Sequence, residues 1–212
     1  MDIYAAIADE RRTLAADLAD LNPEQRATPT LCEGWSVHVT LAHLVVPLEV
    51  GLPRFALAML QARGRFDVAN DRLARRHARR PFEELRYVLD ARADHRFTPP
   101  GEGPEAPLTD VLVHGLDIRW PLGLPLALDP DRARTALTAL MAAPSAVVRR
   151  GSIEGLRFVA DDVGWASGSG PDVTGPADAL LLAVAGRALA LDRLAGDGVA
   201  MLRRRLEPGG AP

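Results

Sequence analysis

The sequence predicts a mainly α-helical protein, with a four-helix bundle over residues 1–148 and a small α/β domain over residues 149–212. Two patterns lead to this prediction. Apolar residues recur at the three- and four-residue spacing of a helix through most of the N-terminal part. After about residue 150, short alternating stretches such as "GLRFVADDVGWASGSGPDVTG" are divided by glycines, which is typical of small strands and turns.

Five helical regions are expected before the change of pattern. Ser36 is placed to cap the second region, and Pro47 and Pro53 are expected to bend or interrupt it. Pro81 is expected to break the third region, since proline is favoured in a first helical turn and acids follow it. The five regions are 2–20, 36–62, 66–95, 108–120 and 129–143.

The segments between these regions are predicted to be loops. Residues 22–35 and 97–107 are rich in proline, glycine and small polar residues. Residues 155–175 are predicted to form strands and turns, and helical spacing returns over 176–196 and 196–206. The bundle is therefore expected to precede a unit of mixed strands and helices.

Composition excludes several functions. All 25 basic residues are arginine, so Schiff-base catalysis through lysine is excluded. The net charge of −3 gives no general attraction to nucleic acid or anionic lipid, and the basic run over 72–80 is interpreted as a solvated helix face. The single cysteine, the charged N-terminal segment and the absence of a long apolar run predict a cytoplasmic protein with no membrane or nucleic-acid partner.

Histidine and aspartate fall on predicted helix faces in a suggestive pattern. His43 continues an apolar stripe with Val39, Ala42 and Val46, so it is expected to face the bundle core. Asp110, His114 and Asp117 stand at i, i+4 and i+7 on a later helix and share one face. Each feature alone also fits a hydrogen-bonded core histidine or an ordinary Asp–His pair. Together they offer two imidazoles and a carboxylate for a divalent metal, and spacing leaves open which aspartate is the ligand.

Three segments carry a resemblance to a known family. "TLCEGWSVHVTLAHL", "DVLVHGLDIRWPLG" and "GSGPDVTGPADALLLAVAGRALALDRLAGDGVAML" resemble the signature regions of the mycothiol-dependent maleylpyruvate isomerase family, part of the DinB-like superfamily of metal-binding four-helix bundles. The resemblance covers nearly the whole chain. It implies a DinB-like bundle with a divalent metal, zinc, held by His43, Asp110 and His114. The family acid is usually glutamate, so the shorter Asp110 is a departure.

The resemblance also implies a reaction. Mycothiol would serve as thiol cosubstrate for isomerisation of, or S-transfer to, a small electrophilic substrate similar to maleylpyruvate. Two alternatives are a metal-dependent hydrolase, in which water replaces the thiol, and a non-catalytic metal- or thiol-binding regulatory protein. Arg187 matches the "GR" of the family's C-terminal domain, which implies that it holds a substrate or thiol carboxylate. The alternative is a structural ion pair with Asp178 or Asp192.

The remaining candidates receive simpler interpretations. Cys32 is a candidate fourth ligand or nucleophile, but no motif pairs it with a base, so it is interpreted as a small buried hydrophobe. Trp35 is interpreted as a packing anchor. His38, His77 and His95 are interpreted as surface or local structural residues.

Overall fold

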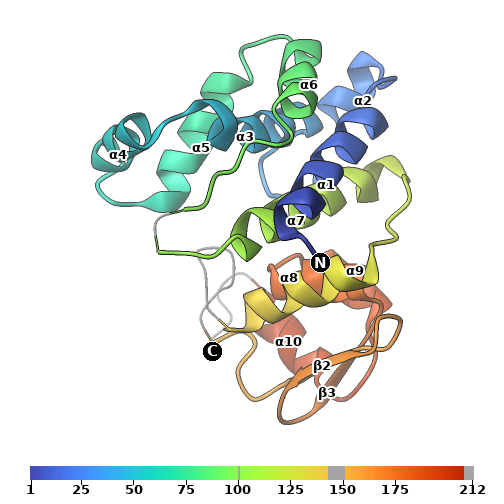
Figure 1. Cartoon of the computed structure of the whole chain (residues 1–212). Helices are drawn as coiled ribbons and strands as arrows, with labels where there is room; N and C mark the ends of the chain where they lie inside the picture. Colours follow the sequence, from blue (N-terminus) through green and yellow to red (C-terminus); the bar gives the residue numbers. More distant parts are fainter. Residues whose placement is uncertain (100, 143–150, 208–212) are drawn as a thin grey trace. The chain divides into compact units, whose positions relative to one another are not determined.

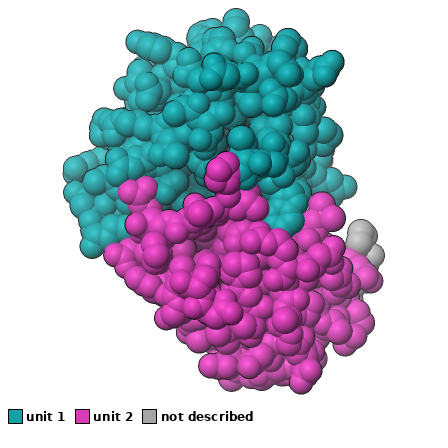
Figure 2. Space-filling model, turned by 90° about the vertical axis from the view of Figure 1, so that its right-hand side faces the viewer, with its two compact units in different colours: residues 1–124 teal, residues 125–212 magenta. Residues whose placement is uncertain are grey.

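Two compact units make up the chain. The computed structural model describes residues 1–99, 101–142 and 151–207, and residue contacts divide it into unit 1, Met1–Leu124, and unit 2, Pro125–Pro212 (Figure 2). The predicted boundary at 148/149 lies outside the described residues, and the division falls earlier. Its physical reason is that helix α8 (Pro130–Ala142) packs against helix α9 (Ala177–Val184) and strand β2 (Trp165–Gly168) of unit 2.

Unit 1 contains the predicted four-helix bundle (Figure 1). Its four helices contact one another in cyclic order, α1 with α6, α6 with α3, α3 with α7 and α7 with α1. The apolar faces predicted from helical spacing supply the core, in which Leu14, Leu41, Leu85 and Leu112 are fully buried. The four helices are α1 (Ile3–Asp17), α3 (Val37–Glu49), α6 (Phe82–Ala91) and α7 (Glu105–Leu122).

Local sequence signals set several helix ends. Ser36 caps α3 as predicted, since its Oγ accepts a hydrogen bond from the Val39 amide at 3.4 Å. Pro81 is the N-cap residue of α6, which confirms the predicted break. Gly123 ends α7 with a φ of 66°, in the left-handed region that glycine occupies without strain.

One helix of unit 1 was not predicted from the sequence. The predicted loop 22–35 contains a short helix, α2 (Pro23–Ala27), because Asn22 and Gln25 form a reciprocal capping box. The predicted second region divides into α3 and α4 (Leu52–Gln61), with Pro53 in the first turn of α4. The remaining helix of unit 1, α5 (Phe66–His77), packs against both α3 and α4.

Unit 2 has the predicted mixture of strands and helices. Strand β1 (Arg157–Ala160) lies between β2, which is antiparallel to it, and β3 (Asp172–Gly175), which is parallel. Phe158 and Val173 are paired across β1 and β3 and are fully buried. Helix α9 covers these two strands and is followed by a 3₁₀ helix, η1 (Ala188–Arg193), and by α10 (Val199–Leu206).

No helix in the described ranges is long and apolar enough to cross a lipid bilayer.

Candidate metal centre

Helices α3 and α7 contribute the polar side chains of the bundle core. His43 is 7% exposed and lies among Leu41, Ala42 and Val46, as the apolar stripe predicts. His114 is 8% exposed on α7, between the fully buried Leu112 and Leu116. Since α3 and α7 pack against each other, the two histidines meet inside the bundle.

The carboxylate of Asp110 lies between the two imidazoles. Its Oδ1 is 3.4 Å from Nε2 of His43 and 3.6 Å from Nε2 of His114. The imidazole ring centres are 4.6 Å apart and nearly perpendicular, at 74°. One ligand atom from each of the three residues falls within 4.8 Å of the others. The structure therefore brings together His43, Asp110 and His114, the three residues that the family resemblance implies.

Asp117 contacts the opposite side of the His114 ring. Its Oδ2 lies 3.0 Å from Nδ1 of His114, and its side chain is fully buried. Asp110 instead faces the Nε2 atoms of both histidines. A carboxylate on the second imidazole nitrogen fixes the orientation of a metal-binding histidine and the nitrogen that carries its proton. Geometry thus separates two aspartates that helical spacing could not distinguish.

Trp35 forms one wall of the cluster. Its ring centre is 5.0 Å from that of His43 and 5.9 Å from that of His114. The indole N–H donates to Oδ1 of Asp71 at 2.8 Å. Arg75 donates to the same oxygen at 2.8 Å and to the carbonyl of Gly34 at 2.9 Å. The "CEGW" loop is therefore tied to α5, and the ring predicted as a packing anchor contacts both histidines.

Charge around Asp110 favours its ionised form. Burial raises the pKa of this carboxyl. The adjacent His43, followed by His114 and Arg11, lowers the pKa by more than burial raises it, to about 2. Arg11 is 4% exposed on α1 and donates to the carbonyls of Ala93 and His95 at 2.8 Å each. Burial lowers the pKa of Arg11, partly offset by Asp110 and Asp94. Asp110 is thus an anion among groups that carry or accept positive charge.

Two residues near the cluster were not singled out from the sequence. Arg11 follows Ile7 and precedes Leu14 at helical spacing, which is the signal that places it on the buried face of α1. Arg75 lies in the basic run interpreted as a solvated face, and it is exposed, but its contacts hold Asp71 and Gly34. A run of basic residues on α5 carries no signal for a contact with Gly34, which lies 41 residues earlier in the chain.

Cys32 lies closer to the cluster than expected. It is half-buried, and its sulfur lies within 4.8 Å of a ligand atom of His114 and of Asp117. Cys32 is therefore less buried than the interpretation as a small buried hydrophobe expects. The expectation that Cys32 is neither a metal ligand nor a nucleophile stays a prediction.

The other three histidines have local contacts. Nε2 of His38 lies 3.0 Å from the Arg80 carbonyl, and Nδ1 of His77 lies 3.0 Å from the Leu73 carbonyl. His95 is exposed, and its carbonyl accepts from Arg11. These contacts agree with the surface and local structural roles expected of them.

Arg187 belongs to unit 2 and does not lie within a helix, contrary to the expectation. Helix α9 ends at Val184, Gly186 follows with a φ of 89°, and Arg187 is the half-buried residue before η1. Its Nη1 donates to the Ala185 carbonyl at 2.5 Å. The two aspartates considered as its partners make other ion pairs, Asp178 with Arg193 and Asp192 with Arg203.

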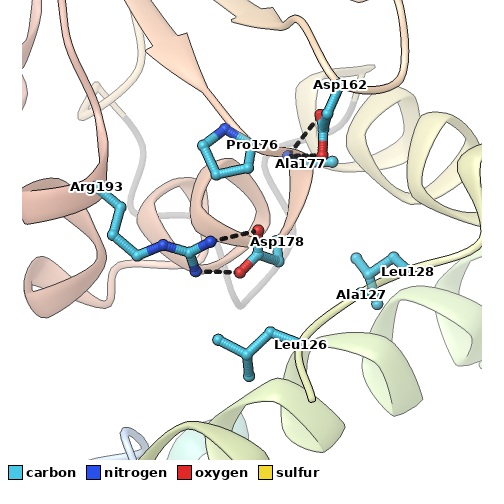
Figure 3. Close-up of a pocket in the computed structure, with 8 residues that line it drawn as sticks. All are labelled: Leu126, Ala127, Leu128, Asp162, Pro176, Ala177, Asp178 and Arg193. Carbon is cyan, nitrogen blue, oxygen red and sulfur yellow. Dashed lines mark hydrogen bonds and ion pairs between the residues drawn. The ribbon is translucent and has the colours of Figure 1, made fainter.

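A hollow of about 440 Å³ lies within unit 2. Figure 3 shows Arg193 and Asp178 pointing toward each other along its wall and Asp162 accepting from the Ala177 amide. These charged groups are thus engaged with one another or with the start of α9. Its lining residues are Leu126, Ala127, Leu128, Asp162, Pro176, Ala177, Asp178 and Arg193.

The cluster in unit 1 fits a divalent metal by the chemistry of its donors. Two imidazole nitrogens and one carboxylate oxygen form the set used at open zinc and iron sites, which leave positions for water or substrate. Nδ1 of His43 is buried and, among the described residues, is the one buried side-chain nitrogen or oxygen without a hydrogen-bond partner. A buried polar atom without a hydrogen-bond partner lowers the stability of the folded state. Such atoms are rare in proteins and are found at functional sites.

Fold and cluster together define a class of protein: a helical bundle that gathers two histidines and a carboxylate at one point of its core. Residues 7–98 match the family model described as the mycothiol maleylpyruvate isomerase N-terminal domain. Residues 7–98 of the chain are therefore similar to the N-terminal domain of this family, in agreement with the resemblance drawn from the sequence motifs.

Solved structures extend the likeness to unit 2. The crystal structure of the mycothiol-dependent maleylpyruvate isomerase matches with a TM-score of 0.60 at 15% identity, covering 92% of each chain. A variant of that enzyme with one histidine changed to alanine matches with the same TM-score, identity and coverage. At this identity the likeness establishes the fold. No curated protein matches the chain by sequence.

Proposed function

We propose that the chain is a cytoplasmic enzyme that uses a divalent metal, zinc, and the thiol cosubstrate mycothiol to act on a small electrophile. The reaction is isomerisation of a maleylpyruvate-like substrate or S-transfer to it. The observation that carries this proposal is the meeting of His43, Asp110 and His114 within 4.8 Å in the core of the helical bundle. The metal would be held by these three side chains.

Each residue of the cluster has a distinct part in this proposal. Asp110 is 33% exposed, whereas His43 and His114 are buried, so the carboxylate marks the side from which small molecules enter. Asp117 accepts from Nδ1 of His114 and so presents Nε2 of that ring to the metal. Trp35 covers both imidazoles and limits water on its side of the site.

A bound metal would lower the pKa of the thiol of the cosubstrate, so that the thiolate would form at neutral pH. The thiolate adds to one carbon of an activated cis double bond, and the π electrons move onto the adjoining carbonyl. Rotation about the resulting single bond and loss of the same thiolate give the trans isomer, with no net change in atoms or electrons. In a transferase, the other carbon of the former double bond, next to the carbonyl, accepts a proton instead, and the sulfur stays attached to the first carbon.

Arg187 is proposed to bind a carboxylate of the substrate or thiol. The support is its match to the family's C-terminal motif and its position directly after α9, where Gly186 turns the chain. A guanidinium offers two parallel N–H donors to a carboxylate, which suits a dicarboxylate substrate.

Thiol dependence tests the proposed reaction. The metal-loaded chain is assayed with maleylpyruvate in the presence and absence of mycothiol, and product is followed by absorbance. We expect turnover only with the thiol. Turnover undiminished by its omission would assign a hydrolase, and metal binding without turnover of any electrophile would assign a regulatory protein. Cobalt-substituted protein should also gain a sulfur-to-metal absorption band on adding thiol, and Cys32→Ser should keep that band.

A further inference from the structure

Helix α4 presents an apolar face to solvent. Leu52, Leu57 and Leu60 are 53%, 54% and 75% exposed, and Phe66 at the start of α5 is 43% exposed. No residue of α4 is buried, although the helix lies beside α5 at the edge of unit 1 (Figure 1). These four are over half of the large hydrophobic side chains exposed in the described ranges. Clustering of this kind marks an interaction surface, whereas single exposed leucines do not.

Positive charge is concentrated in the same segment. Residues 52–72 contain four arginines and two aspartates, a net charge of +2, in a chain whose total is −3. Arg72 and Arg76 are one turn apart on α5, and both are exposed. The expectation of no lipid partner used the charge of the whole chain and interpreted the basic run over 72–80 as a solvated helix face.

The turn between α4 and α5 contains a hollow of about 330 Å³ with three arginines in its lining. Arg72 is held there by a hydrogen bond from Nη1 to the Gln61 carbonyl at 3.2 Å. Arg65 pairs with Asp67 at 3.1 Å, and Arg63 has a φ of 54°. One carboxylate therefore balances three guanidiniums. The lining residues are Gln61, Ala62, Arg63, Arg65, Val68 and Arg72.

We propose that this α4–α5 corner, residues 52–72, docks peripherally on an anionic lipid surface. A headgroup phosphate occupies the arginine-lined hollow, and Leu57 and Leu60 enter the boundary of the acyl chains. An amphipathic helix with leucine on one face and arginine beside it binds membranes in this way. Each basic side chain near an anionic surface adds to the attraction. The proposal is independent of the metal site and of the proposed reaction.

Charge argues against the other occupants. A second copy related by a two-fold axis would bring the same arginines of the corner against one another, so like charges would oppose the contact. A nucleic acid would satisfy the arginines but would leave the leucine face against a hydrated phosphate backbone. A lipid surface satisfies both the arginines and the leucines.

Vesicle sedimentation with the full chain tests the proposal. Vesicles of phosphatidylcholine alone are compared with vesicles containing phosphatidylglycerol, at low and at raised salt. We expect binding only to the anionic vesicles, weakening as salt rises, because counter-ions screen exposed charges. Each of Arg63→Gln and Arg72→Gln should weaken the partition coefficient roughly fivefold. Leu60→Gln should weaken it roughly tenfold.

Matched controls lie in unit 2. Leu189 is 62% exposed, and Arg157 is exposed, as Arg63 and Arg72 are. Leu189→Gln and Arg157→Gln should leave binding unchanged. The proposal is overturned by failure to bind anionic vesicles at low salt, by equal binding to phosphatidylcholine, or by equal losses in the controls. Binding to polyglutamate without binding to vesicles would also overturn it, and would assign the corner to an acidic protein.

Discussion

The indole N–H of Trp35 donates to Oδ1 of Asp71 at 2.8 Å, and this bond holds the ring that covers His43 and His114. The hydrogen bond connects the loop after Cys32 to helix α5, while the ring contacts α3 and α7. The conformation of the candidate metal centre therefore depends on a loop contact as well as on the bundle.

Trp35 should report metal binding by fluorescence. Adding cobalt to the metal-free protein should quench emission, because the Trp35 ring centre is 5.0 Å from that of His43. Trp35→Phe should abolish most of the quenching. Trp165→Phe, which changes a half-exposed tryptophan of unit 2, should retain it. Quenching of the same size in Trp35→Phe would place the bound metal elsewhere.

Asp117→Asn should lower metal affinity without removing a ligand. The carboxylate accepts from Nδ1 of His114, and loss of such a partner typically weakens metal binding by roughly 10- to 100-fold. Competition with a chromogenic chelator measures the change, and circular dichroism checks that the fold is retained. An affinity equal to wild type would show that Asp117 does not orient the ring for a metal.

Asp110→Asn should alter the acid stability of the metal-free protein. The folded-state pKa of about 2 lies below the ordinary value of 3.8, so the ionised carboxylate stabilises the folded state above that ordinary value. This contribution declines as pH falls from about 3.8 through about 2. Urea unfolding across this range should show a steeper loss of stability in wild type than in Asp110→Asn. Parallel losses in the two proteins would contradict the favourable charge environment of Asp110.

Arg187→Ala should separate substrate binding from stability. If the guanidinium binds a carboxylate, the variant should keep its metal and its melting temperature. Its kcat/KM should fall by an amount equivalent to roughly 1.5–3 kcal/mol of binding free energy. A protein that melts much earlier but turns over normally would instead give Arg187 a structural role. Arg203→Ala, in an exposed pair with Asp192, is the matched control and should change neither property.

Helical periodicity predicted the main features of unit 1. The apolar stripe of His43 and the shared face of Asp110 and His114 placed these residues inward, because side chains one turn apart on a helix must point the same way. Family motifs then selected the same three residues. Helical spacing could not predict which aspartate faces Nε2 of His114. Asp110 and Asp117 both lie on the same helix face as His114, and only the orientation of the imidazole ring distinguishes them.

Contacts between distant segments account for the rest. Arg75 reaches the Gly34 carbonyl, and helix α8 joins unit 2 through its packing on α9, neither of which follows from local periodicity. Arg187 was misplaced because its apolar neighbours suggested one continuous helix, whereas Gly186 interrupts it with a φ of 89°. Single residues of this kind decide where a helix ends.

The metal content of purified wild type and His114→Ala tests the central claim most directly. Both proteins are expressed alike, with His38→Ala as control for loss of a half-buried histidine outside the cluster, whose ring contacts the Arg80 carbonyl and Phe82. We expect one divalent ion per chain by elemental analysis in wild type and His38→Ala. His114→Ala should contain almost none, because an open site with three protein ligands has little affinity to spare. Full metal in a folded His114→Ala protein would contradict the assignment of the site.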